Sequence, residues 1–348
     1  MFLRNFWYVA ASDHEVQQKP LGRTILGEPV VIFRTEDGKL SAFEDRCAHR
    51  RLPLSMGKVI GDVLQCHYHG LRFDRTGKCV RVPGQDIIPS GARVKTFPVV
   101  ERYKWIWIWM GDPALADPNK ITDFHWFDDP NWGAKSSYLH VKAEWRLVVD
   151  NLLDLTHLAF VHETTIGNSA LVDNAAVKVQ RNNDNVLVTR WMIDTPAPPT
   201  FVKVGGFKGN VDRWQIIDFL PPGFLRLDVG ASPTGTGAPE GRREGGISMR
   251  NLNAITPETE TTTHYFWGQA HSFDVNNPAT TETIFQQINT AFLEDVAVFE
   301  GQQRAMNARP DSPQVDINAD SGAIQARRII DRLYAEEQTA ATHVVAAE

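Results

Sequence analysis

The stretch CAHRRLPLSMGKVIGDVLQCHYHG, residues 47–70, decides how the first part of this chain folds. It contains two short groups, C-A-H at residues 47–49 and C-H-Y-H at residues 66–69, and each begins with cysteine and ends with histidine. The spacing within each group lets a tight loop turn one thiolate and one imidazole toward the same point. Two such loops side by side predict a metal site with two sulfur and two nitrogen ligands.

The pairing of each histidine with its own cysteine favours iron over zinc. The histidines of a zinc finger usually lie together on one helix. The alternating arrangement instead suits a two-iron cluster in which both thiolates bind one iron and both imidazoles bind the other, which is the Rieske [2Fe-2S] geometry. We therefore predict Cys47, His49, Cys66 and His69 as cluster ligands. Zinc, a disulfide and a chance arrangement stay as alternatives.

The segments around this stretch read as a small all-β domain. Short strand-like runs separated by turns extend from residue 5 to residue 111, and the run WIWIW at residues 105–109 suits a strand that is apolar on both faces. The linker-like GDPALADPN follows, so we place a Rieske domain at residues 1–118 and a catalytic domain at residues 119–348. The latter alternates long strand-like runs with helical ones, which predicts an antiparallel sheet and an α+β fold class.

Composition limits the partners that we expect. The net charge is -6 over 348 residues and the pI is near 6.0, which gives no general attraction to nucleic acid or to an anionic membrane. No apolar run is long enough to span a bilayer, and the first residues lack the pattern of a signal peptide. We expect a cytoplasmic protein with no nucleic-acid and no membrane partner.

A second stretch, DNLLDLTHLAFVH at residues 150–162, indicates a different metal. On a helix, Asp154 shares a face with His157, and Asn151 shares a face with Asp154. His157 and His162 are separated by about 140° of helical rotation, so they reach one metal only if the helix bends, bulges or ends between them. Two histidines with one carboxylate form the facial triad of non-haem Fe(II) sites.

The missing carboxylate is expected on a helix near the C-terminus. The run QQINTAFLEDVAVFE carries an apolar stripe at helical spacing, made of Ile288, Phe292, Val296 and Phe299. Asp295 falls within this stripe, whereas Glu294 is expected on the opposite side. A carboxylate on a core face needs a partner, so we predict Asp295 as the third ligand. The alternatives are an ordinary salt bridge or cap for the aspartate and ordinary core histidines for the pair.

Together these motifs give the chain a resemblance to the oxygenase component of Rieske non-haem iron oxygenases, and within them to vanillate O-demethylase and toluenesulfonate methyl-monooxygenase. The resemblance runs nearly end to end and rests on phrases such as NFWYVA, CAHR, CHYHG, IWIWMGDPALADP, VDNLLDLTHLAFVH and TPETETTTHYFWGQAHSF. It implies a Rieske domain followed by a catalytic domain with a helix-grip, START-like fold. It also implies the cluster ligands and the iron triad given above.

The resemblance further implies how electrons travel. In this family an acidic residue, here Asp154, links a cluster histidine of one subunit to an iron-ligand histidine of its neighbour, and the subunits form a head-to-tail homotrimer. Asn151, one turn earlier, is expected at the same site. The alternative for Asp154 is a salt bridge with Arg146 or a backbone cap. The chain has no dinucleotide-binding fingerprint and no further cysteine cluster, so a separate NAD(P)H-dependent reductase is expected.

The implied activity is monooxygenation of a methyl or methoxy substituent of a small aromatic acid with dioxygen. Ring dihydroxylation by a Rieske dioxygenase, and electron transfer by a Rieske carrier without oxygenase activity, are the alternatives. Asn253 and Arg250 are the candidates for binding the substrate headgroup, although an arginine in a strand is more often a solvated partner of a neighbouring acid. The substrate itself and the choice between O-demethylation and methyl hydroxylation are left open.

Overall fold

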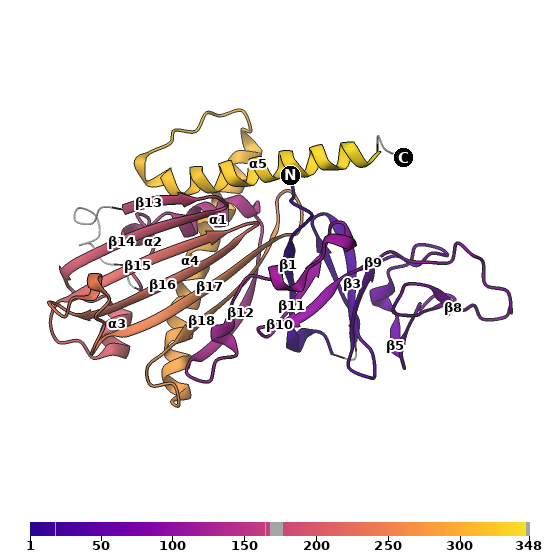
Figure 1. Ribbon diagram of the computed structural model, residues 1–348, viewed down its shortest axis with the longest axis horizontal. Coiled ribbons are helices and arrows are strands. Elements are labelled where there is room, and N and C mark those ends of the chain that lie inside the picture. Colours follow the sequence, from indigo (N-terminus) through magenta and orange to yellow (C-terminus); the bar gives the residue numbers. More distant parts are fainter. Residues whose placement is uncertain (18, 164, 168–176, 346–348) are drawn as a thin grey trace. The chain divides into compact units, whose positions relative to one another are not determined.

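Figure 1 shows the chain as a computed structural model, coloured along the sequence. The residues that the structure describes are 1–17, 19–163, 165–167 and 177–345. None of the described helices is long and apolar enough to cross a membrane.

The chain divides into two units, each with its own sheets. The first unit consists of Met1–Ile121 and Thr256–Glu260, and the second of Thr122–Ile255 and Thr261–Glu348. The predicted boundary after residue 118 lies close to this division. Nothing in the sequence indicates that residues 256–260 belong with the first unit. In the structure, the N–H groups of Leu26 and Gly27 donate to carbonyls of this segment at 2.9 and 2.8 Å.

The first unit is all-β, as predicted, and its antiparallel strands form three small sheets. The strand orders are β1-β11-β10, β2-β3-β4-β9 and β5-β6-β7-β8. Their bounds are β1 Trp7–Ser12, β2 Leu21–Ile25, β3 Glu28–Arg34, β4 Leu40–Glu44, β5 Lys58–Ile60, β6 Val63–Gln65, β7 Arg72–Phe73, β8 Cys79–Arg81, β9 Thr96–Phe97, β10 Val99–Arg102 and β11 Trp105–Trp109. Every residue of β11 is buried, which confirms the strand that is apolar on both faces.

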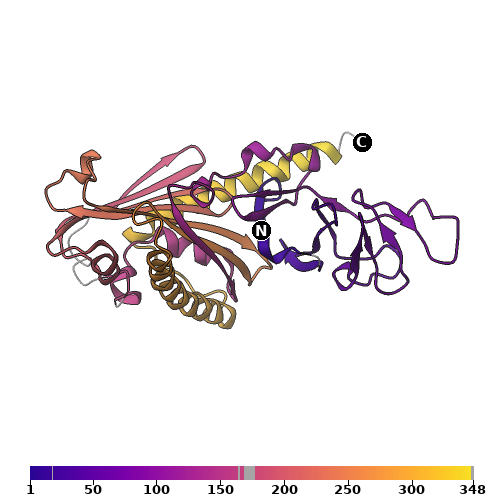
Figure 2. The same ribbon diagram turned by 90° about the horizontal axis from the view of Figure 1, so that it is seen from below.

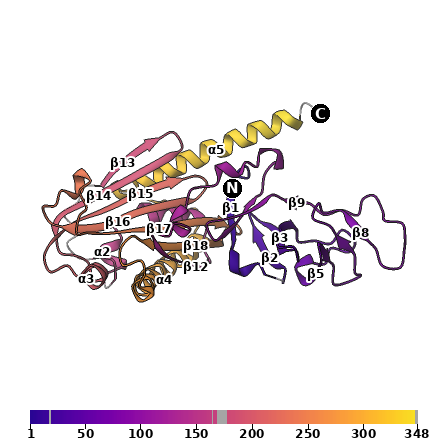
Figure 3. The ribbon, with the colours of Figure 1, turned by 60° about the horizontal axis from the view of Figure 1, so that its bottom comes forward.

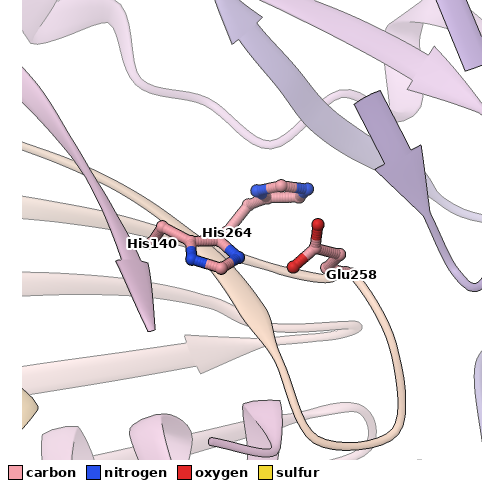
Figure 4. Close-up of side chains that lie close together, drawn as sticks. All are labelled: His140, Glu258 and His264. Atoms are coloured by element: carbon pink, nitrogen blue, oxygen red, sulfur yellow. The ribbon is translucent and has the colours of Figure 1, made fainter. Parts of the chain in front are cut away.

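The second unit is an antiparallel sheet of seven strands with helices packed on it, which confirms the α+β class. The strand order is β12-β18-β17-β16-β15-β14-β13. The strand bounds are β12 Gly133–Val141, β13 Val177–Asn182, β14 Asn185–Thr195, β15 Val211–Leu220, β16 Phe224–Pro233, β17 Ile247–Pro257 and β18 Thr263–His271. The register of β12 on β18 places His140 opposite His264, and both rings are drawn in Figure 4.

The helices of the second unit lie along this sheet (Figure 2). Their bounds are α1 Trp145–Leu153, α2 Leu158–Val161, α3 Pro199–Gly205, α4 Pro278–Ala308 and α5 Ser321–Val345. Helix α4 packs on β12 and β18, helix α5 packs on β13 and β14, and α1 contacts both long helices. Figure 3 shows α3 beside α4.

Short 3-10 turns complete the described structure of both units. They are η1 Asp13–Glu15, η2 Leu54–Met56, η3 Pro113–Leu115, η4 Pro118–Lys120, η5 His125–Phe127, η7 Ala238–Glu240 and η8 Asn318–Asp320.

Aromatic packing fixes α4 against the sheet. Trp267 of β18 stacks on Phe285 with ring centroids 5.1 Å apart, and it meets Phe292 edge-on at 4.9 Å. These contacts orient the predicted apolar stripe of α4 toward the sheet. Asp295 lies in that stripe and is buried. Trp267 is thus a core residue, as is Trp214.

Candidate metal centres and the cavity beside them

The two cysteine loops of the first unit have the same backbone geometry. The N–H of Cys47 donates to the carbonyl of Leu52, and the N–H of Cys66 donates to the carbonyl five residues later in the same way, at 2.9 and 2.8 Å. In each loop the N–H four residues after the cysteine, of Arg51 or Gly70, donates back to the cysteine carbonyl. Both of these residues have positive φ, 61° and 73°, which closes the loop tightly.

The side chains of these loops fit the predicted cluster. Both cysteines are buried and free of any disulfide, whereas both histidines are exposed. Nδ1 of His49 lies 3.1 Å from Nδ1 of His69, so the two imidazoles turn the same nitrogen toward one point. Burial, together with the neighbouring Cys66 thiol, raises the pKa of Cys47 to about 11. Cationic iron bound here would offset the energetic cost of burying the negatively charged thiolates.

In the second unit, the end of a helix separates the two predicted histidine ligands. Helix α1 ends at Leu153, and Asp154 has an extended backbone. Oδ1 of Asp154 accepts hydrogen bonds from the N–H and the hydroxyl of Thr156, both at 2.7 Å, which turns the chain out of the helix. His157 and His162 then flank the four-residue helix α2. This break removes the angular separation that one continuous helix would impose on the two rings.

The structure brings His157, His162 and Asp295 together. One ligand atom from each lies within 4.8 Å of the others. Nε2 of His162 lies 3.1 Å from Oδ1 of Asp295, and Nε2 of His157 lies 3.7 Å from the same oxygen. Two imidazole nitrogens and one carboxylate, converging in a buried site, are the donor set of non-haem Fe(II) centres. The residues present therefore fit a mononuclear iron.

Asn151 holds the carboxylate of this group in place. It lies in the last turn of α1 and donates from Nδ2 to Oδ1 of Asp295 at 3.1 Å. The aspartate side chain is only 4% exposed to solvent. The Asn151 amide and the two imidazoles therefore replace water as the polar partners of its carboxylate.

Glu294 is the residue that the sequence analysis misplaced. It was expected on the far side of α4, but its Oε2 lies 2.7 Å from Nδ1 of His162. A helix position fixes the direction of Cβ only, and the longer glutamate side chain reaches back to the histidine. Burial lowers the pKa of His162, but Asp295 and Glu294 outweigh it, so the pKa lies above its usual value. The carboxylate fixes the ring with Nε2 facing inward and makes the site attractive to a cation.

Asp154 lies beside the other histidine. Its Oδ2 is 3.6 Å from Nδ1 of His157, a buried nitrogen with no hydrogen-bond partner among the described residues. Burial raises the pKa of Asp154, but His157 and Thr156 outweigh it, so the pKa lies below its ordinary value. The backbone cap to Thr156 that was considered as an alternative is present, and it occupies one carboxylate oxygen. The second oxygen faces the histidine.

A cavity opens beside the three ligand residues. It is partly open to solvent, and His157, His162 and Asp295 lie in its wall. The sheet contributes alternate residues of three adjacent strands, as the two-residue period of a strand requires. They are Arg213 and Gln215 of β15, Leu227 and Val229 of β16, and Met249 and Asn251 of β17.

The two predicted headgroup residues are placed elsewhere. Arg250 follows Met249 and therefore points to the opposite face of the sheet, where its Nη1 donates to Oδ1 of Asp228 at 2.5 Å. Asn253 is fully buried and bonded, since its Oδ1 accepts from the Tyr265 hydroxyl at 2.8 Å. Neither lies among the described residues that line the cavity. Arg213, in contrast, was not singled out, although the alternation in VDRWQI could have drawn attention to it.

Comparison with known protein families covers most of the chain. Residues 6–98 match the Rieske [2Fe-2S] domain, and residues 141–336 match the vanillate O-demethylase oxygenase C-terminal domain.

Similar proteins match over nearly their full lengths. The iron-sulfur subunit of the toluene-4-sulfonate monooxygenase system of Comamonas testosteroni is 45% identical, over 97% of this chain and 98% of that protein. The vanillate O-demethylase oxygenase subunit of a Pseudomonas species is 39% identical, over 98% of this chain and 97% of that protein.

Among solved structures, dicamba monooxygenase bound to dicamba superimposes with a TM-score of 0.88 at 35% identity, over 97% of this chain and 99% of that one. This structural match and the two domain matches agree with the metal-ligand geometry of both units. The chain therefore belongs to the Rieske iron oxygenases of the vanillate O-demethylase family.

Proposed function

We propose that this chain is the terminal oxygenase of a Rieske monooxygenase system that hydroxylates a methyl or methoxy substituent of a small aromatic acid. Its relatives support this substrate class, because toluene-4-sulfonate and vanillate are aromatic anions that carry a methyl and a methoxy group. The sulfonate and vanillate enzymes are similar enough to this chain for either type of carbon to be the target.

The observation that carries the proposal is the cavity beside the ligand residues. Its remaining wall is largely apolar, with Leu227, Val229 and Met249 from the sheet and Ile288 and Phe292 from α4. Apolar walls with a few polar groups are typical of small-molecule sites. An aromatic ring held there has its substituent next to His157, His162 and Asp295.

When bound, iron held by two histidines and a carboxylate offers open positions where dioxygen and substrate meet, and the Rieske cluster supplies electrons one at a time. The chain keeps this arrangement rigid. Glu294 fixes the His162 ring, Asn151 fixes Asp295, and the apolar wall keeps water from the reacting groups. A hydroxylated methoxy group is a hemiacetal, which falls apart to a phenol and formaldehyde. A hydroxylated ring methyl group stays as an alcohol.

Asp154 connects the two kinds of iron in this proposal. Besides the cavity, Asp154 and His157 line a second cleft, formed with residues 314–316 and with α5. This cleft would admit a cluster histidine of a neighbouring subunit, and Asp154 would link that histidine to His157. The exposure of His49 and His69 supports such a contact, because their imidazoles are accessible at the surface of the first unit.

The proposed system contains further proteins. The relatives are named as a subunit of a system and as an oxygenase subunit, so a reductase partner is expected for this chain as well. We assign to it an NAD(P)H-dependent reductase of the flavin and ferredoxin type. A head-to-tail homotrimer in the cytoplasm completes the proposal.

The test is substrate-dependent oxygen consumption by the purified chain with a generic reductase. Methoxybenzoates, methylbenzoates and arylsulfonates are screened, with formaldehyde assayed in parallel. We expect one class to stimulate oxygen uptake, with one formaldehyde for each methoxy group lost or one benzylic alcohol for each methyl group oxidised. The His157→Ala variant, which lacks a proposed iron ligand, is the control and should show no substrate-dependent oxygen consumption.

Two results would refute the proposal. Incorporation of both oxygen atoms into the ring, without formaldehyde or alcohol, would show a dihydroxylating dioxygenase. Electron-linked activity that survives intact in His157→Ala would show an electron carrier.

A further inference from the structure

Arg213 is a buried arginine in the wall of the cavity. It lies on β15, the third strand from one edge of the sheet, paired with Met192 on one side and Ala231 on the other. Its exposure is 2%. Its neighbour at the next inward position of the strand, Gln215, lines the same cavity.

Among the described residues, only a small part of the hydrogen-bonding capacity of Arg213 is used. Nη2 donates to the carbonyl of Ile166 at 3.0 Å, and the guanidinium lies 5.1 Å from the ring centre of Phe201. Nε and Nη1 are buried and have no partner among the described residues, and none of the described carboxylates forms an ion pair with it. Two buried, unpaired donors on one fork are uncommon, since the unpaired state is costly.

The charge around Arg213 makes the lack of an anionic partner in the described part of the chain more costly still. Burial, together with the neighbouring Arg190, lowers the pKa of Arg213 to about 9, so the group is still a cation at neutral pH. A buried cation without a partner is strongly unfavourable. A planar fork with free N–H groups is also the geometry that binds carboxylates and other oxyanions in a bidentate manner.

We propose that Arg213 is the specificity-determining residue that binds the carboxylate or sulfonate of the aromatic substrate. This inference rests on the proposed function, because it assigns the headgroup site of the same cavity. Arg213 projects from the sheet, whereas Asp295 projects from α4. An aromatic acid anchored by its anion at the sheet therefore presents its other end to the iron ligands.

Two amide side chains refine the assignment. The carbonyl oxygens of Gln215 and Asn251 are buried, line the cavity and have no partner among the described residues. Each accepts a hydrogen bond from a substrate hydroxyl or other ring donor. The preferred ligand is thus an aromatic anion, with the amides ready to bind a polar ring substituent.

The first experiment measures equilibrium binding by calorimetry with the holoprotein under anaerobic conditions. The ligands are 4-toluenesulfonate, 4-methylbenzoate and their neutral amides, so that sulfonate, carboxylate and uncharged headgroups are compared directly. We expect Arg213→Met to raise the Kd of the preferred anion by about 30-fold or more and to change the Kd of its amide by less than about threefold. Arg213→Lys, which keeps the charge but loses the fork, should fall between.

Arg250→Met is the matched control. Arg250 is an arginine of the same sheet that is paired with Asp228 on the opposite face, so its removal should leave the Kd of every ligand unchanged. Stability gives a second readout. Because Met replaces an uncompensated buried cation, ligand-free Arg213→Met should melt at a higher temperature than wild type.

The proposal is overturned if Arg213→Met weakens the binding of anions and of amides equally, or if it leaves the binding of both unchanged. It is also overturned if the variant destabilises the ligand-free protein, since that result shows a structural role. Failure of the proposed function is separate. If wild type oxidises none of the aromatic acids but still binds an aryl anion through Arg213, the headgroup site stands and the reaction is different. If turnover occurs and Arg213→Met has an unchanged KM, the reaction stands and the headgroup site is elsewhere.

Discussion

The two metal-binding regions of this chain are built in opposite ways. The cysteines and histidines predicted as cluster ligands in the first unit lie within residues 47–69, on two loops with the same internal hydrogen bonds. The three side chains proposed to hold iron in the second unit are His157, His162 and Asp295, and Asp295 lies on an element far away in the sequence. A local site depends on loop geometry, whereas a site joined across the fold depends on packing. The following predictions test this difference.

The largest effect is expected for Asp295→Ala. The proposed triad loses its carboxylate, and the two histidines are left without the negative charge that attracts a cation. Mononuclear iron and turnover should be lost, while the cluster in the other unit stays intact. Metal analysis and the visible spectrum of the cluster measure the two centres separately, and bleaching of the cluster would contradict their independence.

Asp154→Asn tests the link between the centres. The amide keeps the size of the side chain but loses the charge next to His157. Both metals should load normally, whereas single-turnover oxidation of the cluster in the presence of substrate should slow by about 10–100-fold. Wild-type kinetics in this variant would remove the carboxylate from the electron route.

Glu294→Gln probes the outer support of the triad. The glutamine still reaches Nδ1 of His162 but no longer supplies a negative charge. The affinity for Fe(II) should fall by about 10-fold, which is at the lower end of the effect expected when a group that hydrogen-bonds to a metal-binding histidine is changed. Titration of the apoprotein with Fe(II) measures it, and Glu163→Gln, at an exposed position nearby in the sequence, is the control.

The smallest effect concerns the two cluster loops. Gly70 has φ of 73°, and an added Cβ would lie 3.0 Å from Cγ of Pro83. Gly70→Ala should therefore destabilise the loop by about 1–2 kcal/mol, seen as cluster loss at a lower temperature. Arg51→Gly, at the matching position with φ of 61°, should shift cluster loss slightly upward. Shifts of the same sign at these two positions would contradict the equivalence of the loops.

Much of the candidate site could be predicted because its side chains carry a periodic or spaced signal. Asp295 stood out as a charge within an apolar helical stripe. The fold class followed from the alternation of strand-like and helical runs, and the cofactor types followed from motif spacing. Glu294 was misplaced because helical periodicity gives the direction of Cβ but not the reach of a long side chain. Arg250 was chosen and Arg213 was not considered, because the sequence does not show which strand face meets the cavity.

The sequence by itself predicted which residues are spaced to bind metal, and it determined that a β-rich part is followed by an α+β part. These properties depend on residue type and on spacing along the chain, which the sequence contains directly. Only the tertiary structure decided that α1 ends before His157, that Glu294 reaches His162, and that Arg213 rather than Arg250 faces the cavity. Each of these depends on which surfaces pack together, and packing joins residues that are distant in the sequence.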